Sequence, residues 1–342
     1  MQWEIGIDMG SAGVRMAQRE NGVLFAEHAD MAFYAHERQP FAWGDEAHAL
    51  AGRCPASVQL RRPMLDGVLE DAQVAQLWVQ QLSKQADATH RNRRGTVLMS
   101  YAPGSRAAHE EALMRAALDA GALEVGLVRS DVAGAIGAGL EVLEPGASFV
   151  LEIGAGHISA SVWTLGRLAA GGSIPYGLHR IDELLRRALI ANHGFSIGGP
   201  SVESVRRLLG AAGGVQLSDG VEMRVPGFDL KSRMARVELL HPSDVTPVIA
   251  PMISEIVFLL NGLIAQIPEE LAADLIDSGL TVVGGGASLP GLDRVLGEAL
   301  DIPCFIAEEP EKAVVRGLYE ILRRSIHFDD LVTDRMARAG RN

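Results

Sequence analysis

The segment IGIDMGSAG, residues 5–13, joins a short apolar run to an acid and a glycine-rich turn, and the architecture can be worked out from it. A second stretch, FVLEIGAG at residues 149–156, repeats that order. After each turn a further run with apolar alternation follows. This predicts a β-hairpin and excludes the dinucleotide-binding fingerprint, in which the turn opens a helix. Asp8 and Glu152 take equivalent places, so the pattern predicts a duplicated unit and two related domains.

A third glycine turn follows the apolar run in LTVVGGGAS, residues 280–288. Between these strand-like runs, apolar residues recur three to four positions apart, which predicts helices. The segments are 74–85, 107–120, 132–140, 181–191, 202–209, 245–265 and 292–300. Pro145-Gly146 indicates a crossing between domains. The sequence therefore predicts a mixed α/β chain of two lobes with a cleft between them.

Composition narrows the function classes. The 342 residues carry a net charge of −12, which argues against broad nucleic-acid binding. Cys54 and Cys304 lie far apart, which excludes a disulfide scaffold and fits a reducing compartment. No basic leader opens the chain, and the most apolar stretch, 248–267, carries polar residues at helical spacing. We expect a soluble, cytoplasmic protein in which this stretch is a buried amphipathic helix.

The glycine turns suggest phosphate chemistry. A turn without Cβ atoms exposes successive backbone N–H groups that bind phosphate, and two facing turns can clamp a polyphosphate. Asp8 and Glu152, at the strand ends, are candidates to hold Mg²⁺ through water. The turn at Gly284, Gly285 and Gly286 allows a base or an α-phosphate to approach the backbone. One such turn is more often only a turn, but three in this order are more specific.

Further motifs give the chain a recognisable pattern. They are Gly44-Asp45-Glu46-Ala47, RPMLDGV at 62–68, AIGAGL at 135–140, PEELAAD at 268–274 and VGGGASLPGLD at 283–293. With these motifs the chain resembles the actin, heat-shock-chaperone and sugar-kinase ATPase superfamily. Within it, the chain is similar to the MreB family of bacterial actins over residues 4–322.

The resemblance implies an α/β, actin-like (ribonuclease H-like) duplicated fold, with ATP and Mg²⁺ in a cleft between two domains. Each domain has a small subdomain. Domain I is expected at 1–144, with its small subdomain at about 31–75. Domain II is expected at 145–325, with its small subdomain at about 180–245, and a tail follows at 326–342.

The resemblance also implies roles for residues. The first phosphate loop holds Asp8, Gly10 and Ser11, and the second holds Glu152, Gly154, Ala155, Gly156 and His157. Glu203 and Arg206 flank the ribose and base, and Gly284, Gly285 and Gly286 line the adenosine side.

Three departures from the family pattern bear on hydrolysis. The family's Asp-Ile-Gly-Gly-Gly-Thr-Thr-Glu is here EIGAGHIS, residues 152–159, and a family Gly-Gly-Asp is here Gly177-Leu178-His179. The family's Glu-Glu-Pro is here Arg129-Ser130-Asp131. Ser130 replaces the glutamate that orients the attacking water, with Asp131 the nearest substitute. Losing such a group costs about 10²–10⁴ in rate, so we expect weak hydrolysis.

The resemblance predicts a filament protein for cell shape and wall synthesis, assembling with itself or with paralogous actin filaments. It also suggests contact with the inner membrane surface and with wall-synthesis proteins. The loop expected to carry an apolar membrane anchor reads His90-Arg91-Asn92-Arg93-Arg94 and is basic. Two alternatives stay open: a nucleotide-independent adaptor with the actin fold, and an active ATPase of chaperone or kinase type.

Overall fold

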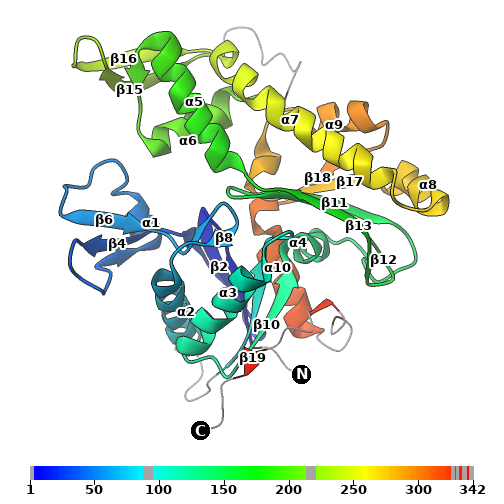
Figure 1. Ribbon diagram of the computed structural model, residues 1–342. Coiled ribbons are helices and arrows are strands. Elements are labelled where there is room, and N and C mark those ends of the chain that lie inside the picture. The colour runs from blue at the N-terminus through cyan, green and yellow to red at the C-terminus, as the bar shows by residue number, and fades with distance from the viewer. Residues whose placement is uncertain are drawn as a thin grey trace.

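The protein is built of alternating layers of helix and sheet. The computed structural model describes residues 4–87, 95–212 and 221–324, with residues 328, 331–332 and 337–338. Two sheets lie apart from each other, with two helices between them and further helices on their outer faces (Figure 1). His90, Arg91, Arg93 and Arg94 lie outside the described residues.

The first sheet has the strand order β19-β10-β9-β1-β2-β3. Strands β1, β2 and β3 run antiparallel, whereas β1, β9 and β10 run parallel. All five residues of β1 are buried, as expected for a strand that is covered on both faces. The outer face of this first sheet packs against α2 and α3. The bounds are β1 Ile5–Met9, β2 Gly13–Gln18, β3 Gly22–His28, β9 Thr96–Tyr101, β10 Glu124–Arg129, β19 Ala337–Arg338, α2 Ala72–Asp87 and α3 Ala107–Asp119.

The second sheet repeats this topology, with the order β13-β12-β11-β17-β18. Its first three strands along the chain are again antiparallel, and β11, β17 and β18 are parallel. The duplication predicted from the two glycine turns is therefore confirmed by strand order and direction. The bounds are β11 Ser148–Ile153, β12 Ile158–Thr164, β13 Arg167–Ile174, β17 Leu280–Val283 and β18 Cys304–Ile306.

Two helices, α4 (Ser130–Gly137) and α10 (Ala313–Arg323), fill the space between the sheets. Each follows the last parallel strand of its sheet, so they are equivalent parts of the duplication. They approach closely at two glycines: a methyl group on Gly137 would overlap the carbonyl oxygen of Ala313, and one on Gly317 would overlap that of Ala133. The two lobes therefore share one apolar layer at their centre.

The outer face of the second sheet is covered by helices that form the core of the second lobe. They are α5 Leu178–His193, α6 Gly199–Leu209, α7 Pro242–Ile264, α8 Glu269–Ser278 and α9 Leu292–Leu300. Among the described residues, α7 is the one helix long and apolar enough to cross a membrane, and a third of its apolar window is buried. The predicted buried face exists, from Val245 to Leu263, but the opposite face leaves Phe258 83% exposed.

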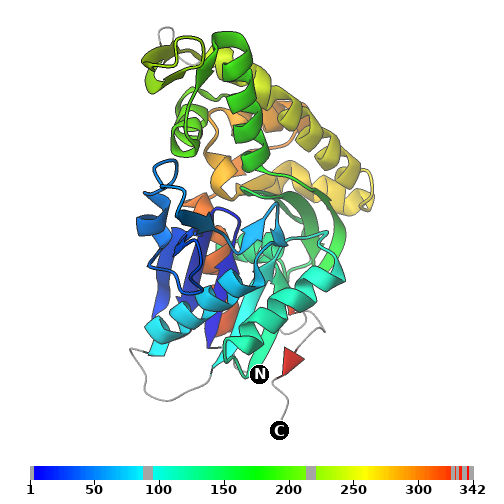
Figure 2. The same ribbon diagram turned by 60° about the vertical axis from the view of Figure 1, so that its left-hand side comes forward.

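A small subdomain extends from each lobe, on the same side of the molecule (Figure 2). The first consists of β4 Met31–Tyr34, β5 Ala42–Trp43, α1 Gly44–His48 and β6 Val58–Arg61, with the hairpin of β7 Met64–Leu65 and β8 Val68–Leu69. The second joins α5 and α6 to β14 Phe195–Ser196, β15 Met223–Asp229 and β16 Ala235–Leu240. The domain boundaries expected from the sequence stay predictions.

Candidate functional site

A cleft of about 580 Å³ opens between the lobes, a size typical of small-molecule sites. Both glycine turns, the start of α4, the α5–α6 wall and the short 3₁₀ helix η1 (Gly285–Ser288) contribute to it. Most of the residues predicted from the sequence line it together. They are Asp8, Gly10, Ser11, Ser130, Glu152, Gly154, Ala155, Gly156, His157, Glu203, Arg206, Gly284 and Gly285.

The two glycine turns have the same backbone hydrogen bond. The amide of Gly10 donates to the carbonyl of Gly13 at 2.9 Å, and the amide of Gly154 donates to that of His157 at 2.9 Å. His157 therefore holds the position in the second turn that Gly13 holds in the first. The second turn carries an imidazole where its counterpart carries no side chain.

The turn between β7 and β8 forms the floor of the cleft and lies against both glycine turns. Asp66 and Gly67, between β7 and β8, both have positive φ, 46° and 75°. The amide of Gly67 donates to Ser11 Oγ at 3.3 Å. A methyl group at Gly156 would overlap Ser11 and approach the backbone nitrogen of Gly67 to 2.5 Å. The absence of a side chain at Gly156 thus allows the turns of the two lobes to touch.

Asp8 is held by two partners. It lies directly opposite Arg15 in the β1–β2 register, and its Oδ2 lies 3.3 Å from Arg15 Nη1. Its Oδ1 accepts a hydrogen bond from Ser100 Oγ at 2.8 Å. Burial raises the pKa of Asp8 above its usual value, and it outweighs the lowering by Arg15.

Glu152 is the corresponding acid of the second lobe, and it is held more tightly. Its Oε2 accepts hydrogen bonds from Ser130 Oγ at 2.6 Å and Ser159 Oγ at 3.3 Å. His157 Nε2 lies 3.5 Å from the same oxygen. Burial alone would raise the pKa of Glu152, but His157 and the hydroxyls hold it below its usual value. Glu152 in turn raises the pKa of His157 above its usual value, against the effect of burial.

The wall formed by α5 and α6 is polar and charged. Arg206 is only 6% exposed, and its Nε donates to Asp182 Oδ1 at 2.6 Å. Glu203 and Arg207 line the cleft beside this pair. The buried ion pair fixes α5 against α6 and so sets the position of this wall.

Comparison with known proteins identifies the family. The family model described as "MreB/Mbl protein" matches residues 2–329. The chain belongs to the MreB/Mbl family. Cell shape-determining protein MreB of Escherichia coli is 30% identical over 338 residues, covering 97% of this chain and 96% of the relative. Cell shape-determining protein Mbl of Bacillus cereus is 27% identical over 314 residues, covering 92% and 94%.

Solved structures of MreB-like proteins have the same fold. MreB5 of Spiroplasma citri bound to ADP superimposes with a TM-score of 0.88 at 24% identity, covering 95% of this chain and 97% of that one. The same protein bound to AMPPNP gives a TM-score of 0.85 at 25% identity, with the same coverage. The double helical filament of MamK gives 0.77 at 16% identity, covering 93% and 97%. The predicted actin-like, two-domain α/β fold is therefore confirmed.

Two residues predicted for this MreB-family site lie off the wall of the cleft. Asp131 is fully buried, and its carboxylate accepts two hydrogen bonds from Arg129, at 3.0 and 2.6 Å. It also accepts the amide of Val132 at 2.8 Å, which places it at the first turn of α4. Gly286 packs against Ile153, where a methyl group would overlap that side chain. Neither residue is among those that line the cleft.

Residues that the sequence analysis did not assign to the site also line the cleft, among them Arg15, Asp182, Arg207 and Lys312. His179, which stands where the family pattern has an acid, lines it as well. For the Asp66–Gly67 turn a signal was present, because Asp-Gly between apolar residues is typical of a two-residue hairpin. For Arg15 the signal was the hairpin register, which sets it opposite Asp8 once the turn length is known.

The Mg²⁺ site predicted from the sequence, held through water by Asp8 and Glu152, stays a prediction. Mg²⁺ is held by carboxylates and phosphates that bring negative charge. Here Asp8 already has Arg15 beside it, and Glu152 already has His157. Among the described residues, no group of three or more His, Cys, Asp or Glu side chains is placed to hold a metal ion.

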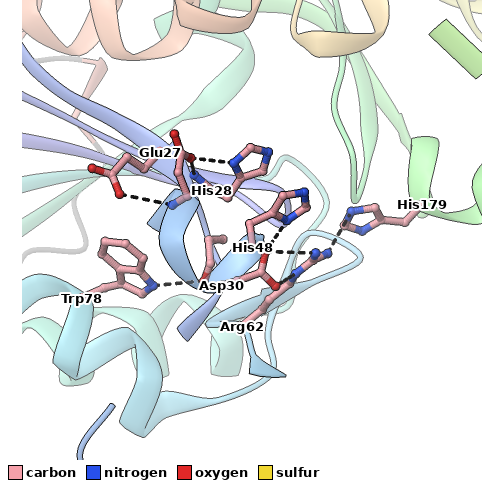
Figure 3. Close-up of polar contacts among 9 residues, drawn as sticks. Glu27, His28, Asp30, His48, Arg62, Trp78 and His179 are labelled. Carbon is pink, nitrogen blue, oxygen red and sulfur yellow. Dashed lines mark hydrogen bonds and ion pairs between the residues drawn. The ribbon is translucent and has the colours of Figure 1, made fainter. Parts of the chain in front are cut away.

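A polar contact joins the two lobes at the mouth of the cleft (Figure 3). Arg62 Nη1 lies 3.3 Å from Nε2 of His179, at the start of α5. The same guanidinium donates to Asp30 through Nε at 2.7 Å, and His48 Nδ1 lies 2.8 Å from the other Asp30 oxygen. Burial and then Arg62 lower the pKa of His179, which leaves its ring neutral and able to accept a hydrogen bond.

Proposed function

We propose that this chain is an ATP-binding, actin-like protein of the cytoplasm that forms or joins filaments supporting cell shape and wall synthesis. The observation that carries the proposal is the cleft, where glycine turns from both lobes meet the α5–α6 wall. Two relatives are named as cell shape-determining proteins, and MreB5 has been solved with ADP and with AMPPNP. MamK, with the same fold, has been solved as a filament.

Hydrolysis in this cleft is proposed to be weak. A group that activates water needs basicity and must lie within hydrogen-bond reach. Ser130 has a hydroxyl in place of the expected carboxylate, and that hydroxyl already donates to Glu152. Asp131, the nearest substitute, is held by Arg129 away from the cleft wall. The proposed role of the nucleotide is therefore to hold the lobes together and permit assembly.

Contact with the inner membrane and with wall-synthesis proteins is the finer part of the proposal. Its support is the family and the basic sequence Arg91-Asn92-Arg93-Arg94. Each arginine near anionic lipid adds about 1 kcal/mol, so attachment through this loop alone would be weak and sensitive to salt. We therefore propose that a partner filament supplies most of the attachment.

The test combines ATP binding by calorimetry with sedimentation of the purified chain, with and without ATP. We expect ATP to bind and to increase the pelleted fraction, with slow phosphate release. Gly285→Val is the variant that tests whether ATP binds in this cleft. A methyl group at Gly285 meets no atom within 4 Å, so the fold tolerates it, while the larger side chain takes space in the cleft. The variant should keep its melting temperature and lose ATP affinity.

Two results would overturn the proposal. Absence of ATP binding would favour the nucleotide-independent adaptor, and pelleting only with a paralogous filament would then identify its partner. Phosphate release as fast as in ordinary actin-like ATPases would favour an active ATPase and would contradict the weak-hydrolysis proposal.

A further inference from the structure

We propose that the hairpin of β15 and β16 is a contact surface for an anionic lipid bilayer. The inference rests on the membrane contact proposed above and assigns a surface to it, on the small subdomain of the second lobe. The hairpin lies at the opposite end of the molecule from α2 and α3 (Figure 1, Figure 2). Its two strands are joined by a tip at residues 230–234.

The outer face of this hairpin is apolar, although its inner face already packs on the core. Val225 and Leu240 are buried in the core of the second lobe. The side chains between them along each strand point the other way and are exposed, and the apolar ones are Pro226, Phe228, Ala235, Val237 and Leu239. The outer face of such a sheet is ordinarily polar, yet Val237 is 53% exposed. An exposed apolar face of this kind indicates a binding surface.

The tip of the hairpin extends the apolar surface and is held in place by its own hydrogen bonds. Leu230 and Met234 are 45% and 67% exposed. Asp229 Oδ1 accepts hydrogen bonds from the backbone amides of Lys231 and Ser232, at 2.9 and 2.7 Å. Because these bonds already fix the tip, binding a partner orders little additional chain and loses little entropy.

Cations without acidic partners surround this apolar surface. Arg236 is paired within the hairpin, with Asp229 and Glu238. Three exposed cations form no ion pair in the part of the chain that the structure describes, namely Arg224, Lys231 and Arg233. Against them stands the exposed Glu222, just before β15. The surface is therefore apolar with a positive rim, in a chain whose net charge is −12.

An anionic bilayer matches both properties of this surface. Apolar side chains enter the boundary between head groups and acyl chains, while lysine and arginine stay among the phosphates. A second copy docked through the same face would set the cations of the two copies against each other, because such a contact is symmetric. One hairpin offers little apolar area, so a single copy binds weakly and reversibly, and a filament multiplies the effect.

The experiment is sedimentation of the purified full chain with vesicles, in the absence of nucleotide. One set of vesicles is phosphatidylcholine, and the other is an equal mixture of phosphatidylcholine and phosphatidylglycerol. We expect the chain to pellet with the anionic vesicles and to be released by salt. Met234→Ser should lower the partition coefficient at least about threefold, because it removes apolar surface that enters the bilayer. Lys231→Gln should lower it about fivefold.

Ile276→Ser on α8 is the matched control, because Ile276 is 65% exposed, close to the value for Met234, and lies outside the hairpin. Circular dichroism melts confirm that each variant is folded. Hairpin variants that pellet with anionic vesicles as well as Ile276→Ser would overturn the inference and leave the proposed membrane contact to the basic sequence at 91–94.

Two further results would overturn the inference. A wild type that pellets with neither set of vesicles would overturn the proposed membrane contact as well, and it would leave nucleotide binding and filament assembly untouched. A wild type that pellets without vesicles, and does so less in the Met234→Ser variant, would assign the hairpin to contact between copies of this chain.

Discussion

At the scale of single residues, the cleft differs from its sequence expectation mainly at Ser130. Its hydroxyl is 2.6 Å from Glu152 Oε2, and the residue is 4% exposed. A buried carboxylate needs hydrogen-bond donors, because an unsatisfied ionised group costs free energy in a site shielded from water. Ser130 therefore stabilises the charge of Glu152, and its contribution is structural.

We expect Ser130→Ala to lower the free energy of unfolding by about 1–3 kcal/mol, because it removes the shortest hydrogen bond to a buried carboxylate. Urea unfolding at neutral pH measures this. Ser204→Ala is the control, since Ser204 is exposed and bonds only locally, to the carbonyl of Pro200. Equal midpoints for the two variants would show that Ser130 does not stabilise Glu152.

At the scale of elements, the central pair α4 and α10 joins the lobes through backbone contact. Ala133 and Gly137 on α4 meet Ala313 and Gly317 on α10, with the same spacing of small residues on both helices. Small residues at this spacing allow helices to pack at short range, and a Cβ at either glycine has no room. The packing therefore depends on glycine at both positions.

Gly317→Ala should destabilise the protein by about 1–3 kcal/mol, because overpacking outweighs the better helix propensity of alanine. Gly262→Ala on α7 is the comparison. No atom lies within 4 Å of a methyl group there, so this variant should gain up to about 1 kcal/mol. Thermal melts of both variants measure the difference. A gain in stability at both positions would show that α4 and α10 separate at little cost.

The sequence predicted elements better than it predicted contacts. Glycine turns after apolar runs mark β1 and β11 locally, and helical periodicity located α9 at its observed bounds. The prediction missed α10, because its second and third residues, Val314 and Val315, are β-branched and its interior holds Gly317, and both residue types are weak helix formers. The hydrogen-bonded cluster around Glu152 could not be predicted from the sequence, because Ser130 is 22 residues away and lies beside Glu152 only in the folded chain.

At the scale of the whole molecule, three of the places where the described residues join the lobes are the central helices, the floor of the cleft and its mouth. The first two contacts are tight and involve glycine at close approach. The third is polar and partly exposed, since the side chain of Arg62 is 31% exposed. Of these three contacts, the Arg62–His179 contact is therefore the one suited to open and close.

The contact should weaken in acid. The pKa of His179 lies below its usual value of 6.5 in the folded protein, so its contribution to stability is present above that value and is lost as pH falls. Protonation sets two cations side by side, and Arg206 adds to the repulsion while Asp66 and Glu203 oppose it. The free energy of unfolding should fall more steeply in wild type than in His179→Asn, by at most about 1.4 kcal/mol per pH unit.

Urea titrations between about pH 7.5 and about pH 5.5 compare the two proteins, in the range where an ordinary histidine changes charge. The other histidines are common to both, so the difference isolates His179. Asparagine keeps a hydrogen-bond acceptor for Arg62, which separates the loss of titration from the loss of the contact. Parallel pH profiles would show that His179 does not change charge at the mouth of the cleft, and acid would then leave the approach of the two lobes unchanged.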